Sequence, residues 1–402
     1  MRSFAASFAA AVVLAAPAAA AQKAPPSILG VLWYQGRTTA VAKLDALTLA
    51  PLVQSAVVHG PAALVVRSPD GRRALFSLDE DGATLRVLDL DTMTWSAPFV
   101  APGSSGETAV WTDDDRIVLL AGADPSWISV VDAKTGRQKL VRTLRQTVVA
   151  AAPTRRAIVA VLAPVGRIGR ARLAVVDERG GVRSIPLRGI TAGSKIVSSQ
   201  PFRMRTRVPG LAVDPDGDRA VVVAASGSLV EVDLATLAPA AHRLAARTLA
   251  ARRKSIEGTF RTARWFGRFV AVTGYDWDPS APDRAEPVGL WFVDTRDWSA
   301  RSVDPDATAA VVAGGHLVAV RDFWNADAQR LEGVEATGYD ADARQVFDVF
   351  VPGMSWLSGT AGSLLYIAAD NLARFEIVDA VTGAVVAPSV TPPQTTSILG
   401  DT

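Results

Sequence analysis

The chain has 402 residues, a formal net charge of +2 and no cysteine. So small a net charge excludes nucleic-acid binding driven by charge, and the lack of cysteine excludes disulfides, cysteine nucleophiles and lipid-modified cysteine anchors. A chain of this length can bury a sizeable core without such supports.

Residues 1–21 have the three parts of a secretory signal peptide. Arg2 is followed by an apolar run from Phe4 to Ala16 and by small residues up to Ala21, which is the pattern that precedes cleavage. A transmembrane anchor is the alternative, but the run is shorter than the ~20 residues that cross a bilayer. We therefore expect residues 22–402 to be exported, either secreted or held in the cell envelope, with no membrane insertion after cleavage.

An apolar strand ending in Asp and followed by a short polar turn recurs eight times, at intervals of 39 to 61 residues. The repeated residues are Asp45, Asp89, Asp132, Asp177, Asp233, Asp294, Asp340 and Asp379. This interval is about the length of one four-stranded propeller blade. We expect Asp89, Asp132, Asp233 and Asp379 to have a structural role, accepting backbone N–H bonds in their turns.

The second repeat can be divided into four strands. These are predicted at Ala62–Arg67, Arg72–Leu78, Thr84–Leu90 and Trp95–Val100. Pro69 and Gly71 suit a tight turn between the first two strands. Short apolar runs at this spacing predict an all-β fold.

The innermost strands of a propeller are crowded, which favours small apolar residues. Candidates are Thr147–Ala151, Pro209–Val213, Ala307–Val312 and Gly353–Leu357. The first repeat, Ile28–Val57, lacks such a strand, and Thr395–Leu399 is a spare one after the last repeat. We predict a single, monomeric β-propeller of eight blades over residues 22–402, closed by both termini so that no sheet edge stays open. Seven blades is the alternative, with the sixth or seventh repeat as an insertion.

The stretch from Ser68 to Leu75 (SPDGRRAL) and the Val-Asp-x-x-Thr-Gly turns at Asp132 and Asp379 resemble the WD40-like and YVTN-type bacterial β-propellers. The resemblance covers essentially all of residues 22–402, although the Gly-His and Trp-Asp pairs of true WD40 repeats are absent. It implies the fold and leaves the function open, because these motifs are shared by many unrelated proteins.

The long insertions fall between the second and third strands of a repeat or between repeats. They are residues 164–170, 188–208, 245–259, 275–287 and 322–333. Both kinds of connection lie on the same face of a propeller, so we expect one loop-rich face. Long loops are frequent sites of function, which makes this face the candidate recognition surface.

The insertions carry aromatic and basic side chains. The candidate binding residues are Tyr275, Trp277, Phe323, Trp324, Arg203, Arg205, Arg207, Arg252 and Arg253. Exposed aromatic groups beside charged ones are typical of surfaces that bind peptides or glycans. Alternatively, the Trp side chains pack the loops onto the propeller and the charges are solvated.

Signatures of catalysis and of metal binding are scarce. The chain has no G-x-S-x-G, H-E-x-x-H or Walker motif, and its histidines, His59, His242 and His316, lie in three different repeats. Asp276, Asp278 and Asp283 could hold Ca²⁺ or act as acid and base, or could be solvated loop residues. We predict no metal, no cofactor and no catalytic residue.

These observations favour an exported, non-catalytic propeller that binds a protein, peptide or glycan through its loop-rich face. The alternative is a propeller enzyme, a lactonase-like hydrolase or quinoprotein-like oxidoreductase, with its site at the mouth of the central channel. Such a site needs several carboxylates or histidines there, whereas the predicted inner strands offer Arg67, Arg261 and Arg264 near their ends.

Overall fold

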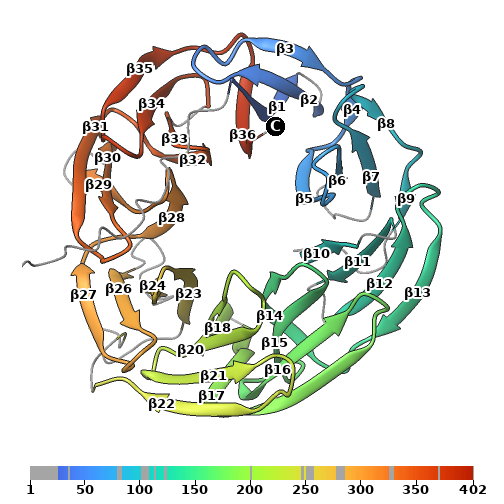
Figure 1. Ribbon diagram of the computed structural model, residues 1–402, viewed down its shortest axis with the longest axis vertical. Helices are drawn as coiled ribbons and strands as arrows, with labels where there is room; N and C mark the ends of the chain where they lie inside the picture. Colours follow the sequence, from blue (N-terminus) through green and yellow to red (C-terminus); the bar gives the residue numbers. More distant parts are fainter. Residues whose placement is uncertain are drawn as a thin grey trace, which may run out of the picture.

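The computed structural model forms a ring of β-sheets (Figure 1). It describes residues 26–34, 37–78, 84–100, 108–112, 115–121, 125–199, 202–245, 249, 258–277, 286–325, 330–369 and 372–401. Within these ranges the chain forms strands and turns and no helix, so none of it is a helix that could span a membrane. The protein is therefore an all-β propeller.

The first sheet combines the two ends of the chain. From the inside outwards its strands are β36 (Thr395–Asp401), β1 (Ser27–Tyr34), β2 (Thr38–Asp45) and β3 (Pro51–Gln54), and β4 (Val58–His59) also pairs with β2 (Figure 1). β1 and β36 are antiparallel, with Val31 opposite Ser397. Trp33 Nε1 donates a hydrogen bond to Ser397 Oγ over 3.0 Å. The last strand in the sequence therefore lies beside the first.

Five further sheets each consist of strands that are consecutive in the chain. One contains β5 (Ala63–Arg67), β6 (Arg73–Ser77), β7 (Thr84–Asp89) and β8 (Thr94–Trp95), with β9 (Phe99–Val100) also on β7. The next contains β10 (Thr108–Trp111), β11 (Arg116–Ala121), β12 (Trp127–Asp132) and β13 (Gln138–Thr143). Another contains β19 (Gly210–Val213), β20 (Arg219–Val223), β21 (Ser228–Asp233) and β22 (Pro239–Arg243). The last two contain β28 (Ala309–Ala313), β29 (His316–Asn325), β30 (Arg330–Tyr339) and β31 (Gln345–Pro352), and β32 (Trp356–Ala361), β33 (Leu364–Ala368), β34 (Phe375–Asp379) and β35 (Val385–Val390).

The remaining sheet has ten strands and joins two parts of the ring. It contains β14 (Thr147–Pro153), β15 (Ala157–Ala163), β16 (Gly169–Asp177), β17 (Val182–Ser199), β18 (Phe202–Val208), β23 (Gly258–Phe266), β24 (Phe269–Trp277), β25 (Glu286–Pro287), β26 (Leu290–Asp294) and β27 (Ala300–Asp304). The link is a parallel pairing of β18 with β23, from Thr206 opposite Gly258 to Val208 opposite Phe260. The β17–β18 hairpin thus connects the two sheet units on either side of the sheet β19–β22 (Figure 1).

Several predicted strand boundaries differ from the structure. In place of one strand over Trp95–Val100, the structure has two two-residue strands, β8 and β9, which both pair with β7. The innermost strand predicted at Gly353–Leu357 begins instead at Trp356, because Gly353 has a φ of +69° and turns the chain before it. Residues 188–208, predicted as a loop, form most of the β17–β18 hairpin, and much of 322–333 belongs to β29 and β30.

The core lies between neighbouring sheets because strand side chains alternate in direction. On β15, Ile158 and Ala160 pack toward β11, whereas Val159 and Val161 pack toward β20. Both faces of a middle strand are therefore buried, which explains why these strands read as continuous apolar runs. Each fully buried Val or Ile contributes roughly 1.5–3 kcal/mol relative to an exposed one.

The repeated aspartates hold their turns, as predicted. Asp132 Oδ1 accepts hydrogen bonds from the backbone N–H groups of Lys134 and Thr135 and from the Thr135 hydroxyl. The same carboxylate-to-backbone bonds form at Asp89, Asp233 and Asp379. Their structural role is confirmed.

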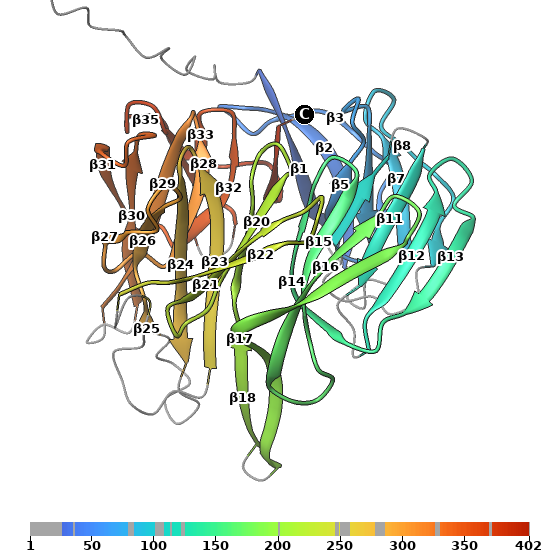
Figure 2. The ribbon, with the colours of Figure 1, turned by 60° about the horizontal axis from the view of Figure 1, so that its bottom comes forward.

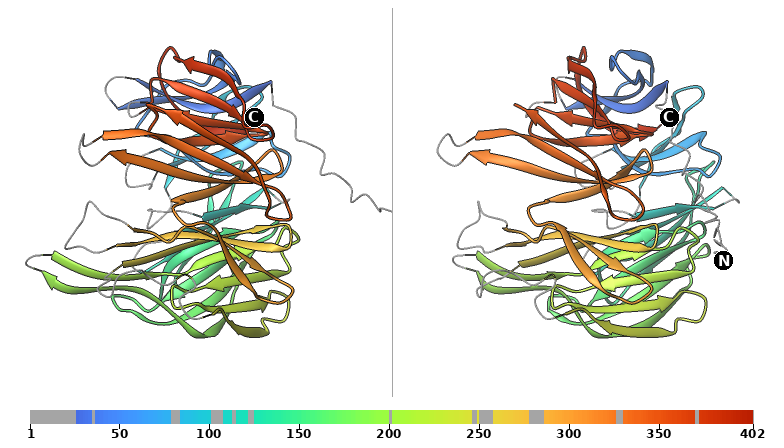
Figure 3. Two further views of the ribbon diagram at one scale, coloured as in Figure 1. Left: turned by 90° about the vertical axis from the view of Figure 1, so that its left-hand side faces the viewer. Right: turned by 60° about the vertical axis from the view of Figure 1, so that its left-hand side comes forward.

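One face of the ring is more elaborate than the other. The β17–β18 hairpin and the end of β24 extend beyond the remaining sheets (Figure 2), and the hairpin of β29 and β30 reaches out on the same side as β17–β18 (Figure 3). We call this side, defined by those three segments, the elaborated face. In the described residues, 188–199, 202–208, 322–325 and 330–333 belong to strands rather than loops.

Candidate binding site

A row of three side-chain pairs runs along the sheet where β23 and β24 meet. Because same-face residues on a strand are two apart, Phe260, Thr262 and Arg264 point to one side of β23. The antiparallel register places them opposite Tyr275, Thr273 and Ala271 of β24. The order from the elaborated face inward is therefore an aromatic pair, a hydroxyl pair and a cation beside a small residue.

The aromatic pair gives the site a flat apolar surface. The Phe260 and Tyr275 rings are stacked, with centroids 4.7 Å apart and an angle of 20° between their planes. Tyr275 is 41% exposed, so its outer side is open to a ligand. An exposed ring held by a second ring can receive a planar group or the apolar face of a sugar.

The hydroxyl pair and the cation follow deeper in the ring. Thr262 Oγ1 and Thr273 Oγ1 share a hydrogen bond of 2.6 Å. Arg264 is exposed to solvent, but partial desolvation of its guanidinium by neighbouring atoms lowers the pKa of that group. In the described parts of the chain no hydrogen bond or ion pair of Arg264 is found, so this cation is left without a counter-charge there.

These side chains border a cavity of about 210 Å³. Its opposite wall comes from the neighbouring sheet, at Thr308, Ala309 and Ala310 next to and within β28. Asp322 of β29 lies beside the Thr308 hydroxyl, and burial raises the pKa of its carboxyl group. The cavity thus has an aromatic ring at one end, hydroxyl groups along its length and a cation on one wall.

A buried ion pair lies beneath the aromatic pair. Arg261 Nη1 is 2.8 Å from Asp276 Oδ1, and the two side chains are 0% and 2% exposed. Arg261 also donates to the carbonyl oxygens of Phe260, Tyr275 and Leu249 over 2.9, 3.2 and 2.7 Å. One guanidinium therefore fixes the backbone on both sides of the stacked rings.

This ion pair bears on the three aspartates, Asp276, Asp278 and Asp283, that the sequence alone left as candidates for a Ca²⁺ site. Asp276 is neither solvated nor available to a metal, because Arg261 neutralises it in the interior. Asp278 and Asp283 lie outside the described residues. Across the described chain no group of three or more His, Cys, Asp or Glu side chains is arranged to hold a metal ion.

Gly274 is needed between Thr273 and Tyr275. Its φ is +148°, and a Cβ atom there would lie 2.0 Å from the Phe260 carbonyl oxygen. Only glycine avoids that overlap, since it has no side chain. The close approach of the two strands brings the Phe260 and Tyr275 rings into contact.

The predicted aromatic residues lie on two strands: Tyr275 and Trp277 on β24, and Phe323 and Trp324 on β29. Trp277 is half-buried opposite Gly258 on the strand that carries Tyr275. Phe323 contacts Phe350 with ring centroids 5.3 Å apart and lies under the Arg321 guanidinium at 4.2 Å; within the described chain its ring is not found against Tyr275 or Trp277. For Trp324, the structure gives only its position on strand β29. The expectation that all four lie in loops is wrong, because they belong to extended strands.

The predicted basic residues have different environments. Arg205 is exposed on β18, opposite Lys195. Arg207 is half-buried, and burial together with the charge of Arg205 lowers its pKa, an effect that Asp276 partly offsets. For Arg203, the structure gives only its position on strand β18. Arg252 and Arg253 lie outside the described residues.

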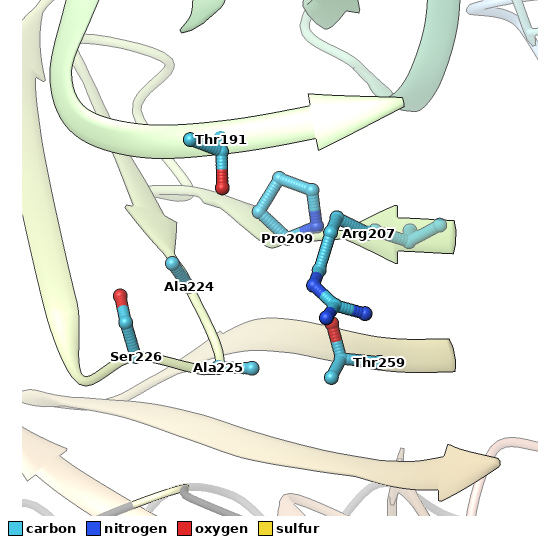
Figure 4. A pocket seen from close by; sticks show the side chains of 8 residues that line it. Thr191, Arg207, Pro209, Ala224, Ala225, Ser226 and Thr259 are labelled. Carbon is cyan, nitrogen blue, oxygen red and sulfur yellow. The ribbon is translucent and has the colours of Figure 1, made fainter. Parts of the chain in front are cut away.

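Arg207 borders a second, smaller cavity of about 80 Å³ next to Pro209, Ser226 and Thr259 (Figure 4). Its guanidinium also donates to the Thr206 carbonyl oxygen over 2.9 Å. This space holds a few water molecules at most. Of these two cavities, we regard the one beside Tyr275, which combines an exposed aromatic ring with hydroxyl groups and a cation, as the candidate site.

The histidines do not converge. His242 stacks on Trp298 with ring centroids 4.1 Å apart, and His316 Nδ1 lies 2.9 Å from the Ala380 carbonyl oxygen. His59 borders a separate cavity near Arg86. Each histidine belongs to a different sheet.

Sequence reasoning missed part of the site. Phe260, Thr262, Thr273 and Gly274 were not singled out, although Arg261 and Arg264 were noted. The available signal was the alternation of FRTAR at residues 260–264 against TGY at 273–275, but it becomes a site only once the strand register is known.

No protein-family model and no curated protein sequence matches this chain significantly. Among solved structures, it is similar to the dihydro-heme d1 dehydrogenase NirN in complex with DHE, with a TM-score of 0.59, 13% identity, and 94% of this chain and 76% of the other covered. It is also similar to apo AztD from Citrobacter koseri, with a TM-score of 0.50, 16% identity, and 92% and 96% covered. At such low identity these similarities concern the fold, and that fold is the β-propeller.

Proposed function

We propose that this protein is an exported, monomeric, non-catalytic β-propeller that binds a peptide, protein or glycan through its elaborated face. The observation that carries the proposal is the exposed Tyr275 ring stacked on Phe260 at the end of a cavity. Aromatic side chains at a concave surface are typical anchors of binding sites. Export rests on residues 1–21 alone.

The buried Arg261–Asp276 pair supports a binding role for the surface above it. It holds the backbone of Phe260 and Tyr275 in place before any ligand arrives. A preformed site loses less conformational entropy on binding than a flexible one. Such a site suits recognition and requires no catalytic group.

We further propose that eight four-stranded units make up the ring and that both termini close it. The strand pairings support this count if the ten-stranded sheet is divided at the β17–β18 hairpin. The pairing of β36 with β1 supports closure. Closure would give β1 a partner on its inner side, so that this strand is not an exposed edge.

The alternative is a propeller enzyme with its site at the channel mouth. It is favoured by the similarity in fold to a dihydro-heme d1 dehydrogenase. It is disfavoured by the inner strands, where Arg67 and Arg264 stand in place of clustered carboxylates or histidines.

The proposal is tested with arrays of purified peptides and glycans, probed with the mature protein. We expect binding to be lost in Tyr275→Ala, whose melting temperature should change little because the ring is exposed. Tyr34→Ala, a half-buried tyrosine of β1 in the first sheet, is the matched control and should bind normally. Binding that survives Tyr275→Ala would place recognition elsewhere.

A second test concerns the predicted tryptophans. If they contact the ligand, Trp277→Ala with Trp324→Ala abolishes binding and leaves stability nearly unchanged. If the double variant instead loses several kcal/mol, given ~3–5 kcal/mol for each truncated buried ring, these side chains pack the hairpins onto the ring.

A further inference from the structure

The cavity beside Tyr275 presents its chemistry in a fixed order. Phe260, Thr262 and Arg264 are successive same-face residues of β23. At ~3.4 Å per residue, the first and last are roughly 14 Å apart along the strand. A ligand that meets all three must carry a flat face, polar groups and a negative charge in that sequence.

We infer that the site binds the end of an acidic oligosaccharide: a sugar carrying a carboxylate enters the cavity toward Arg264, and the preceding sugar lies on Tyr275. This inference deepens the proposed function and rests on it, since it names the ligand of the same site.

The positive charge of Arg264 favours a ligand that carries a negative charge. In the described chain its guanidinium has no hydrogen-bond or ion-pair partner, and Arg264 borders the cavity together with Ala271 and Ala310. Arg264 is exposed to solvent, but neighbouring atoms partly desolvate its guanidinium and lower the pKa of that group. A carboxylate brought by the ligand matches the planar guanidinium and can form two parallel hydrogen bonds.

The other residues that border the cavity suit a sugar ring. The hydroxyls of Thr262, Thr273 and Thr308, which border the cavity, offer donors and acceptors to the hydroxyl groups of a sugar. Tyr275 offers a surface for the apolar face of a pyranose. A volume of about 210 Å³ is below the range of ordinary drug-sized pockets, so it admits one sugar unit and the rest of the chain stays outside on the elaborated face.

The test is calorimetric titration of the mature protein with tri-galacturonate and with the neutral galactose trimer at constant ionic strength. We expect the acidic trimer to bind at least ten-fold more tightly. Arg264→Gln should remove that preference by weakening the acidic trimer about ten-fold and leaving the neutral one unchanged. Tyr275→Ala should weaken both trimers. Arg344→Gln is the matched control, since Arg344 is 77% exposed and lies outside the cavity, and it should behave like wild type.

A second variant keeps the test decisive if Arg264→Gln does not fold. Ala309 is exposed on the opposite wall of the cavity, so Ala309→Glu introduces a carboxylate that competes with the ligand for Arg264. It should abolish the acid preference. Retention of that preference in the folded Ala309→Glu or Arg264→Gln variant would overturn the inference.

Further outcomes separate the two proposals. If the wild type binds both trimers equally, the inference that the ligand is acidic is wrong, and the proposed glycan-binding function stands. If benzoate or acetate competes as strongly as the trimer, the site recognises only the carboxylate, and the inference that its ligand is a sugar is wrong. If neither trimer binds, but the arrays reveal a peptide that depends on Tyr275, the inference falls and the proposed function stands. If no array member binds in a Tyr275-dependent manner, the proposed function falls.

Discussion

Asp132 shows how one carboxylate stabilises a blade. Lys139 lies 3.0 Å from its Oδ2 atom, and its Oδ1 atom accepts the hydrogen bonds of the following turn. The interactions with Lys139 and with the Thr135 N–H lower the pKa of Asp132 from 3.8 to about 2. The folded state therefore favours the ionised carboxylate.

This depressed pKa predicts a pH-dependent contribution to stability. A group with a lowered folded-state pKa stabilises the protein above its unfolded pKa of 3.8 and loses that effect as the pH falls toward 2. Asp132→Asn should therefore cost about 1 kcal/mol at pH 7 and progressively less below pH 4. Urea unfolding from pH 7 to pH 2.5 measures this, with Asp216→Asn in an exposed turn as control. A cost that stays constant over the whole range would contradict the argument.

The Arg261–Asp276 pair should be the most sensitive polar contact beneath the candidate site. Asp276→Asn leaves a buried guanidinium without its counter-charge, which costs ~3–5 kcal/mol. The double variant Arg261→Met with Asp276→Leu should recover part of this loss, because no buried charge remains. Urea unfolding of both variants measures the difference. If the single and double variants are equally stable, the charge pairing is not the source of the cost.

At the level of elements, β23 and β24 depend on Gly274. In Gly274→Ala the new methyl group would overlap the Phe260 carbonyl oxygen, and the strands must separate where the aromatic pair forms. We expect a loss of ~1–3 kcal/mol from strain and weaker binding at Tyr275. The control is Gly315→Ala, at a φ of +78° with no atom within 4 Å, which has the backbone strain without the overlap. Equal losses in the two variants would show that the contact with Phe260 is unimportant.

The β17–β18 hairpin shows why an element can be missed. The sequence predicts residues 188–208 as a loop between repeats, and Gly189 and Gly193 within that range ordinarily mark loops. In the structure Gly189 and Gly193 have φ values of +76° and +111°, and the pairing with β16 shifts its register between Arg170 and Arg172. The glycines bend a continuous strand instead of ending it.

At the scale of the whole molecule, β36 covers the inner edge of the first sheet. Deletion of residues 391–402 would leave the N–H and C=O groups of β1 unpaired and expose an edge prone to aggregation. We expect the truncated protein to melt at a much lower temperature or to aggregate, as measured by calorimetry and light scattering.

Adding the peptide of residues 391–402 provides the control for this truncation, since strand addition can restore a missing edge partner. The peptide should raise the melting temperature of the truncated protein and leave the full-length protein unchanged. Unaltered melting and solubility after truncation would exclude a closing role for β36.

The sequence by itself determined the repeated strands, the Asp turns and the all-β class, because these follow from contacts within a few residues: the alternation of apolar side chains and the bonds of Asp132 to Lys134 and Thr135. Only the tertiary structure decided the candidate site. The row from Tyr275 to Arg264 depends on the register of β23 against β24, and the parallel pairing of β18 with β23 joins segments separated by a whole sheet. Register and the packing of neighbouring sheets are fixed by burial over the entire ring, and no local pattern of residues specifies which side chains will meet.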